Sequence, residues 1–573
     1  MYLCKSMRKT AITLLSLCLT ATIQAQLYVN GHQAPFDYMT NSWLATIPES
    51  YFGQDQSLAI TLDDGWQQMV IDGEQAAEKH TFQHITAESK YPATMLHTDG
   101  HSVSGYIQFT FLPVVRLQGD FGYDYQTGDV TFISPDTEAD NTYSARLKWR
   151  GGTTNTDSKH KRNYNIKFDD DIKLFGMRSD NNWMLDAGQP DVFRMRNRIA
   201  MDVWNDMASK PYYADDEPKA LNGVRGIMVE LFLNDEYRGL YNLSEKLDRK
   251  QMKLKKAGRE GDVHGVLYKG NSFGYTVMND SIYEFDNYAP TLYEYEVKYP
   301  EPGDDNDSTD WKPLVDAINT NLILYYDDDA FRARIADWFD IPVMVDYAVF
   351  LSSVNALDNN GKNMYWANYD KAATHRMTPA PWDLDCSFGQ RWGSRLTEGE
   401  PAKASPQYVT DVVMAVFFNL YRTNALNFND RLRARYAELR QSGGVLATES
   451  LVSRFTRYYN LVKKSGAAAR EEAKWSGDSD VWGDVIDFDT EYQYICDWIR
   501  QHLETVDTKG LPLVWNEEYF DATAVPQLTM DKASHHSRRV SDGFRTLSGQ
   551  RVSATTPLSP GIYIINNKKA VIK

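Results

Sequence analysis

The segment Asp358-Asn359-Asn360-Gly361-Lys362-Asn363 joins an apolar run to two strand-like segments. The apolar run, residues 341–357, has the length and composition of a buried helix. Residues 364–369 and 376–382 are rich in aromatic and other apolar side chains and are separated by a short polar turn, which predicts a pair of strands. A helix, a polar loop and a β-hairpin are therefore expected in succession, and this pattern favours the α+β class.

The predicted hairpin brings Asn363 close to Asp383. Paired strands lie only about 4.8 Å apart, so the residue that enters the first strand and the residue that leaves the second become neighbours. Phosphoryl transfer needs a carboxylate to accept a proton, with an amide and a second carboxylate to hold Mg²⁺, and protein kinases supply these as Asp-x₄-Asn followed by Asp-Phe-Gly. Asp358 and Asn363 have the first spacing. A polar loop that only caps backbone groups is the alternative, and the spacing alone leaves it open.

Composition limits the other functions. The chain has 573 residues, of which 42% are hydrophobic and 13% aromatic, so it can form two to four globular domains at roughly 100–200 residues each. Its formal net charge is −17. An acidic surface repels phosphodiester backbones, and no strong basic patch is visible, so nucleic acid is not an expected partner.

The first 25 residues predict a secretory signal peptide. The basic pair Arg8-Lys9 precedes the apolar run 11–19, and a cleavage site is expected after Ala25. No later segment supplies the roughly 20 consecutive apolar residues of a membrane anchor. Cys386 and Cys496 are the cysteines that remain, too few for a disulfide framework, and we expect Cys386 to be a buried thiol.

The pattern along the chain predicts three regions after the leader. Residues 26–136 alternate apolar and polar side chains between turn residues, which predicts an N-terminal β-domain. Residues 137–512 mix strands with helices and become mostly helical beyond about residue 410, as expected for a helical lobe that packs its own core. Residues 513–573 end in short strand-like segments and are expected to form a small β tail.

Several further motifs occur in order before and around this hairpin. They are Arg150-Gly151-Gly152-Thr153-Thr154, the strand Lys161-Arg162-Asn163-Tyr164-Asn165-Ile166-Lys167, Leu174-Phe175-Gly176, Trp183, Arg196-Asn197, the hairpin from Asn234 through Glu245, and Pro381-Trp382-Asp383. Together they resemble the CotH kinase family, the atypical secreted or coat-associated kinases similar to spore coat protein H. The resemblance extends over roughly residues 142–395 and continues more weakly to about residue 510.

The resemblance implies an atypical protein-kinase-like core that binds ATP and a divalent metal, Mg²⁺ or Mn²⁺. It implies that Asp358 is the catalytic aspartate and that Asn363 and Asp383 are metal ligands. Asp385 is then a supporting or alternative ligand. On the same basis the substrate is a protein, modified at Ser or Thr.

Two lysines compete for the phosphates of the nucleotide. Lys167 lies on a strand just after the glycine turn and has Glu245 as a candidate ion-pair partner. Lys269 lies on a later predicted strand. A strand lysine is more often a solvated surface residue, so both assignments stay open.

The glycine turn is a candidate phosphate-binding loop. Arg150 and Arg196 lie within these motifs and either contact phosphate or form structural ion pairs, while Gly151 and Gly152 provide the turn itself. Residues 155–160 depart from the family pattern, which commonly has an aromatic residue and a proline there. This departure puts the affinity for ATP in question.

The expected function is an exported kinase that acts on a co-exported or surface protein. The segments 547–552 and 558–563 resemble C-terminal tails of secreted proteins from some Gram-negative bacteria, so we expect a periplasmic or cell-surface location; an ordinary β-module is the alternative. A catalytically silent surface scaffold or adhesin is the second hypothesis. Glycoside hydrolysis by Asp383 and Asp385 ranks last, because positions i and i+2 of an extended segment lie too close for that chemistry.

Overall fold

The structure is a computed structural model of the chain. It describes residues 26–511, without residues 138, 153, 259–261, 272–280, 288, 302–309, 357, 392–393, 396–414 and 482–484, and four short strands between residues 544 and 572. The expected signal peptide lies outside the described residues. Contacts within the chain divide it into two compact units, residues 1–524 and 525–573.

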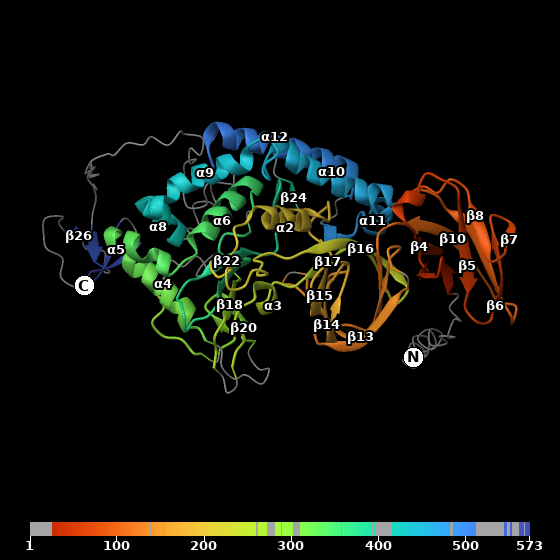
Figure 1. Ribbon diagram of the computed structural model, residues 1–573, viewed down its shortest axis with the longest axis horizontal. Helices are drawn as coiled ribbons and strands as arrows, with labels where there is room; N and C mark the ends of the chain where they lie inside the picture. The colour runs from red at the N-terminus through yellow and green to blue at the C-terminus, as the bar shows by residue number, and fades with distance from the viewer. Residues whose placement is uncertain are drawn as a thin grey trace, which may run out of the picture. The chain divides into compact units, whose positions relative to one another are not determined.

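The first ten strands form a β-sandwich (Figure 1). One sheet has the order β2-β1-β5-β8, the other β3-β4-β10-β9-β6-β7, and a single apolar core that includes Trp43 and Met95 joins them. The strands are β1 (Leu27–Val29), β2 (His32–Ala34), β3 (Phe36–Asp37), β4 (Ser42–Thr46), β5 (Gln56–Leu62), β6 (Trp66–Ile71), β7 (Glu74–Ala76), β8 (Lys79–Phe82), β9 (Tyr91–His97) and β10 (Ser102–Thr110). In strands such as β8 and β9 alternate residues are buried, as the alternating polarity of the sequence predicts, whereas β4 is buried along its whole length.

The next seven strands close into a barrel with the order β11-β12-β13-β14-β15-β17-β16. They are β11 (Val114–Gln118), β12 (Gln126–Ile133), β13 (Asn141–Arg150), β14 (Asn163–Lys173), β15 (Ser179–Asp186), β16 (Gly226–Leu233) and β17 (Glu236–Glu245). Neighbours are antiparallel except β11 and β16, which pair in parallel and complete the closure. The domain boundary expected near residue 136 therefore falls inside this barrel, between β12 and β13.

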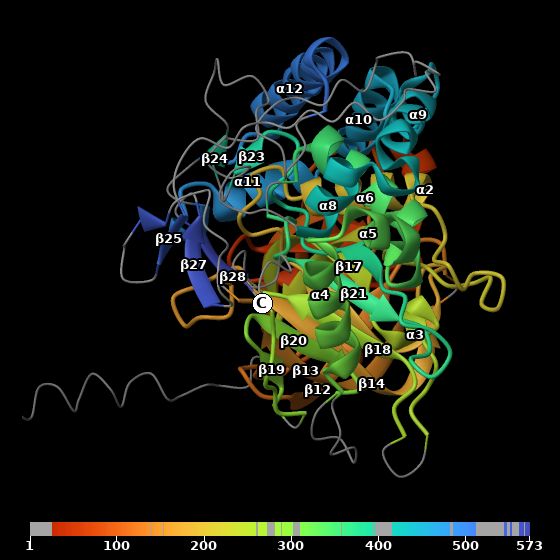
Figure 2. The ribbon, with the colours of Figure 1, turned by 90° about the vertical axis from the view of Figure 1, so that its left-hand side faces the viewer.

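A five-stranded sheet follows the barrel, with the order β19-β20-β18-β21-β22. Its strands, drawn in shades of green in Figure 2, are β18 (Val266–Gly270), β19 (Thr291–Leu292), β20 (Tyr295–Tyr299), β21 (Met364–Asn368) and β22 (Thr378–Pro381). Three helices, α4 (Lys312–Leu324), α5 (Asp328–Arg334) and α6 (Ile341–Val354), lie between β20 and β21 in the chain.

One large core holds the barrel, this sheet and the helices together. Helix α2 (Arg196–Met207) packs on the outside of the barrel, where Met201 shares that core with Met184 of β15 and Met228 of β16. The helical lobe consists of α8 (Ala415–Thr423), α9 (Phe428–Arg440), α10 (Thr448–Lys464), α11 (Ala467–Trp475) and α12 (Phe488–Lys509). The described residues include no helix with the length and apolarity needed to cross a membrane.

The second unit contains a small sheet with the order β26-β25-β27-β28. Its strands are β25 (Phe544–Thr546), β26 (Arg551–Val552), β27 (Gly561–Ile565) and β28 (Lys568–Ile572). The chain as a whole is of mixed α+β class, as the sequence predicts.

Candidate functional site

The predicted helix, loop and hairpin are present. Helix α6 ends where Asn355 turns into the left-handed conformation, and β21 pairs with β22 in a register that sets Met364 opposite Pro381. The amide of Trp382 donates a 3.0 Å hydrogen bond to the carbonyl of Asn363. Asn363 and Asp383 are therefore neighbours at one end of the hairpin, as the sequence predicts.

Both of these residues have unusual backbone conformations. The φ angle is 51° at Asn363 and 56° at Asp383. Residues other than glycine rarely adopt this left-handed region, although Asn and Asp tolerate it best. Such backbone strain is typical of functional sites, where the surrounding structure holds a side chain in a required direction.

Asp358 lies against Asn363 and is buried. Its carboxylate accepts hydrogen bonds from the Lys362 ammonium group and from Nδ2 of Asn363, both at 2.9 Å. The spacing Asp-x₄-Asn thus corresponds to direct contact between the two side chains. An aspartate, an amide and a lysine meet in this loop.

Four carboxyl groups crowd the site, namely those of Asp186, Asp358, Asp383 and Asp385. Burial raises the pKa of Asp383, and Asp186 raises it further, against the lowering effects of Lys269 and Arg150. Burial also raises the pKa of Asp385 well above its ordinary value, and the carboxylates of Asp383 and Asp358 add to this. Asp383 remains exposed on one side although protein surrounds it, so solvent screens part of these effects. We call this group of four the acidic cleft.

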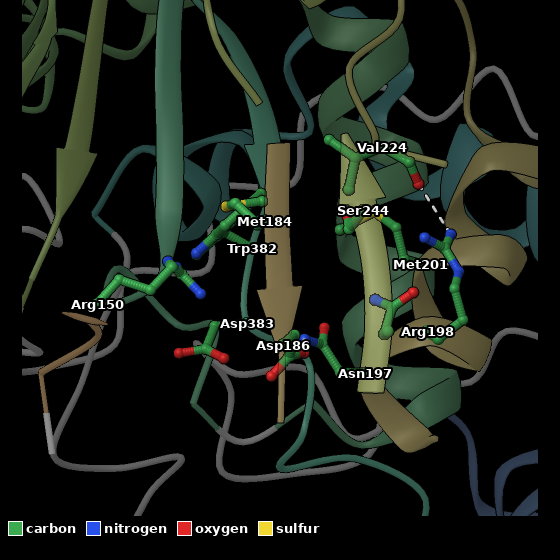
Figure 3. Close-up of a pocket in the computed structure, with 11 residues that line it drawn as sticks. Arg150, Met184, Asp186, Asn197, Arg198, Met201, Val224, Ser244, Trp382 and Asp383 are labelled. Carbon is green, nitrogen blue, oxygen red and sulfur yellow. Dashed lines mark hydrogen bonds between the residues drawn. The ribbon is translucent and has the colours of Figure 1, made fainter. Parts of the chain in front are cut away.

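Asp186 is the member that sequence analysis missed. It is the last residue of β15, and Asn197 of α2 donates a 2.7 Å hydrogen bond from Nδ2 to its carboxylate. Oδ1 of Asn197 in turn accepts a 2.9 Å hydrogen bond from the amide of Leu384. Asn197 therefore connects the barrel with the segment that follows Asp383. Its position in the Arg196-Asn197 motif is the sequence feature that could have pointed to this part of the site. Figure 3 shows Asp186 and Asn197 beside Asp383.

Basic side chains border the acidic cleft from two directions. The Arg150 guanidinium group points toward Asp383 in Figure 3 and lies 5.8 Å from the centre of the Trp382 ring. Lys269 of β18 is half-buried, and burial lowers its pKa to about 8 despite the nearby charge of Asp383. Lys298 of β20 lies near Lys269 and also has a lowered pKa, because burial outweighs the effect of Glu296. Sequence analysis did not identify Lys298.

The structure distinguishes the two candidate lysines by position. Lys269 is among the groups that most strongly influence Asp383, whereas Lys167 is not. Lys167 lies on β14, opposite Arg146 of β13 and Asn182 of β15. The carboxylate of Glu245 is buried and is bound by Arg225, at 2.6 Å, instead of by Lys167.

The glycine turn connects β13 with β14, directly after Arg150. Gly151 has a φ of +116°, and a Cβ atom there would lie 2.1 Å from Oγ1 of Thr154, so the close turn requires glycine. Gly152 faces open space. Arg196, by contrast, is a structural residue: it is fully buried and forms ion pairs with Asp191 at 2.6 Å and Glu491 at 2.5 Å.

A separate group of possible metal ligands lies elsewhere. In the described part of the chain, only His160, Asp478 and Asp480 form a cluster of three or more His, Cys, Asp or Glu residues with ligand atoms within 4.8 Å of one another. The Asp480 carboxylate already accepts hydrogen bonds from the amides of His160 and Lys161, so this cluster holds the loop before β14. The described carboxylates of the acidic cleft do not form such a cluster by themselves. A metal bound there would therefore need the amide oxygen of Asn363 in addition to carboxylates.

The pocket beside Asp383 is small. Its volume is about 20 Å³, enough for one water-sized group, and its lining consists of Arg150, Met184, Asp186, Asn197, Arg198, Met201, Val224, Asn242, Ser244, Trp382 and Asp383. A nucleotide does not fit inside it. Asp383 is exposed, and this open side of the acidic cleft gives a larger ligand access to it.

Comparison with known protein families gives one match, which includes most of the strands and helices that form the site. The family described as CotH kinase protein matches residues 147–506, from β13 to the end of the helical lobe. This span is more than half of the chain, and the chain belongs to the CotH kinase family. No curated protein matches the sequence.

Proposed function

We propose that the chain is an exported, metal-dependent protein kinase with a kinase-like core, which transfers the γ-phosphate of ATP to Ser or Thr of a co-exported or surface protein. The observation that carries this proposal is the contact of Asp358 with Asn363, 2.9 Å apart, next to Asp383 across the hairpin. A proton acceptor, an amide and a second carboxylate then occupy one site. Membership of the CotH kinase family supports the same chemistry.

Each residue has a role in this proposal. Asp358 accepts the proton of the acceptor hydroxyl while the hydroxyl oxygen bonds to the γ-phosphorus and the bond from that phosphorus to the ADP oxygen breaks. Lys269 and Arg150 bind phosphate oxygens from the open side of the acidic cleft, where Lys298 adds a further positive charge. Gly151 and Gly152 form the turn that approaches the nucleotide.

The acidic cleft fits a hard divalent cation such as Mg²⁺ or Mn²⁺. Carboxylate and amide oxygens are the ligands that such ions prefer, and Asn363, Asp383 and Asp385 supply them. Burial, together with neighbouring carboxylates, raises the pKa of both aspartates, and a bound cation would favour their charged forms. When bound, the metal neutralises charge on the phosphates, and Asp186 adds a further carboxylate beside Asp383.

Export and location are part of the proposal. The apolar leader supports secretion to the periplasm or the surface of a Gram-negative-type bacterium, and the strands at residues 544–572 support a sorting or attachment module. ATP is normally scarce outside the cytoplasm. The experiment must therefore distinguish an active kinase from a catalytically silent scaffold that keeps the same fold.

The first experiment incubates the purified mature chain with labelled ATP and Mg²⁺ or Mn²⁺, alone and with co-exported proteins, and measures phosphate incorporation. Calorimetry of ATP binding with metal and with a chelator accompanies it. Changing a direct ligand, Asp383→Asn, should weaken Mn²⁺·ATP binding by at least about 100-fold, because residues that only support ligands already contribute about 10–100-fold. Equal ATP affinity with and without chelator would contradict the metal site, and no transfer with any metal would favour the scaffold.

A further inference from the structure

The side-chain amide of Asn359 binds both strands of the hairpin at the point where they reach the site. Its Nδ2 group donates hydrogen bonds to the carbonyl of Asn363 at 3.2 Å and to the carbonyl of Trp382 at 2.5 Å. The Trp382 carbonyl belongs to the peptide bond that leads into Asp383. One amide group therefore fixes the backbone beside both proposed metal ligands.

These are the two positions where the backbone needs support. Asn363 and Asp383 both have positive φ angles, of 51° and 56°. A residue held in this region typically costs about 1–3 kcal/mol and stays there only when its surroundings determine the conformation. Without the Asn359 amide, the Trp382 carbonyl loses this hydrogen bond and the Asn363 carbonyl keeps the one from the Trp382 amide, so the backbone beside both side chains is held less firmly.

Asn359 is itself firmly anchored. It is fully buried, and its backbone carbonyl accepts a 2.8 Å hydrogen bond from the Tyr347 hydroxyl of helix α6. Its Oδ1 atom accepts no hydrogen bond from any described residue. A buried polar atom without a partner costs about 1–3 kcal/mol. The amide therefore contributes through its two donors, which hold the carbonyls of Asn363 and Trp382.

We propose that Asn359 is a positioning residue that sets the direction of the Asn363 and Asp383 side chains toward metal and nucleotide. The inference rests on the proposed function, since it takes these two residues as metal ligands. Asn359 acts through the backbone carbonyls of Asn363 and Trp382, and its hydrogen bonds reach neither ligand side chain. Its loss should therefore weaken metal–nucleotide binding beyond what a loss of stability explains.

The same strand offers a matched control. Asn368, at the far end of β21, is also fully buried, and its Nδ2 group donates to the carbonyls of Thr374 at 2.9 Å and Arg376 at 3.1 Å. Its Oδ1 atom likewise has no partner among the described residues. Asn368 thus makes the same set of bonds as Asn359 but holds the turn of the hairpin, away from the acidic cleft.

The test compares Asn359→Ala with Asn368→Ala in the full mature chain. Thermal melts measure stability, calorimetry measures the binding of Mn²⁺·ATP, and labelled ATP measures transfer. Both variants should lose stability. Asn359→Ala should bind Mn²⁺·ATP about 10–100-fold more weakly, as expected for a residue that supports metal ligands, whereas Asn368→Ala should stay within about twofold of wild type.

Equal affinities of the two folded variants would overturn the inference. If Asn359→Ala does not fold, Asn359→Ser, which retains a single hydroxyl donor, takes its place, and a folded serine variant with wild-type affinity would overturn it as well. A wild-type chain that binds Mn²⁺·ATP without transferring phosphate contradicts the kinase proposal alone, since the affinities still decide the role of Asn359. A wild-type chain that binds no Mn²⁺·ATP overturns both.

Discussion

Glu491 on α12 and Asp383 after β22 both have charged neighbours, and their pKa values shift in opposite directions. For Glu491, burial favours a higher pKa, but ion pairs with Arg196 and Arg395 outweigh it, and the pKa falls below its ordinary value. For Asp383, burial and the neighbouring Asp186 outweigh Lys269 and Arg150, and the pKa rises.

This difference separates structural charge from functional charge. Glu491 already has its cations, so it connects helix α2 with the helical lobe and offers nothing to a ligand. In the acidic cleft, burial and neighbouring carboxylates outweigh the nearby cations and raise the pKa values, which fits the proposed binding of a cation from solution. The predictions that follow change one region or the other.

The largest effect is expected for Asp358→Asn. The variant keeps the size of the side chain and one oxygen acceptor for Lys362 and Asn363, but it removes the proton acceptor. Turnover should fall by roughly 10²–10⁴-fold, while the fold and the binding of ATP with metal are retained. Phosphate-transfer rates and thermal melts check this. Undiminished transfer by the folded variant would remove the catalytic assignment, and a loss of about 1 kcal/mol in stability with unchanged activity would indicate a loop-capping role.

The next effect concerns stability and belongs to the other region. Glu491→Gln removes one of the two carboxylates paired with the buried Arg196 and leaves Asp191 in place, so it should cost no more than about 3–5 kcal/mol of unfolding free energy. Urea denaturation measures this. The matched control is Glu438→Gln on α9, whose side chain is 60% exposed and whose partner Arg435 keeps its ion pair with Asp346, so stability should change by less than about 1 kcal/mol. Equal losses in the two variants would contradict the structural role of Glu491.

Much of the fold could be predicted because the local pattern of apolar and polar residues determines its helices and hairpins. The helix before Asp358 and the hairpin after it follow from an apolar run and two short apolar strands, and the structure confirms them. Closure of the barrel could not be predicted, because it depends on the parallel pairing of β11 with β16, more than 100 residues later. For the same reason the boundary expected near residue 136 cuts the barrel.

The site could be predicted only where its residues are close in sequence. Asp358, Asn363 and Asp383 lie within one helix–loop–hairpin unit, so spacing and strand pairing brought them together. Asp186 reaches the acidic cleft from a strand almost 200 residues earlier, and only tertiary packing shows this. The alternation of apolar and polar residues along a strand also does not indicate whether Lys167 or Lys269 faces the site. The sequence therefore leaves the choice between Lys167 and Lys269 open.

A smaller effect should separate these two lysines. Lys269→Met removes a cation near Asp383 and should weaken ATP·metal binding by about tenfold or more, which corresponds to about 1.4 kcal/mol. Lys167→Met should leave the affinity within about twofold. Calorimetry on both variants, with melts to confirm folding, measures the difference. A larger loss in Lys167→Met than in Lys269→Met would reverse the assignment.

The smallest effect is a difference in how pH changes stability in the two regions. Because the pKa of Glu491 is lowered, its contribution is present above its ordinary value of 4.5 and is lost as pH falls through the lowered value. Because the pKa of Asp383 is raised, the metal-free chain loses stability as pH rises from the ordinary value of 3.8 through the raised value. The two carboxyl groups therefore act in opposite directions.

Melting curves between about pH 3.5 and pH 7 should show this as two gaps, each being the difference in stability between one variant and wild type. Metal-free Asp383→Asn should become more stable than wild type as pH rises, by no more than about 1 kcal/mol because Asp383 is exposed on one side. The deficit of Glu491→Gln should instead shrink as pH falls below 4.5, where the wild-type carboxyl also loses its charge. Adding Mn²⁺ with ATP at pH 7 should reverse the first gap and leave the second unchanged, since the ligand stabilises only a chain that binds it. An Asp383→Asn gap that does not depend on pH would show that its charge is already compensated within the protein.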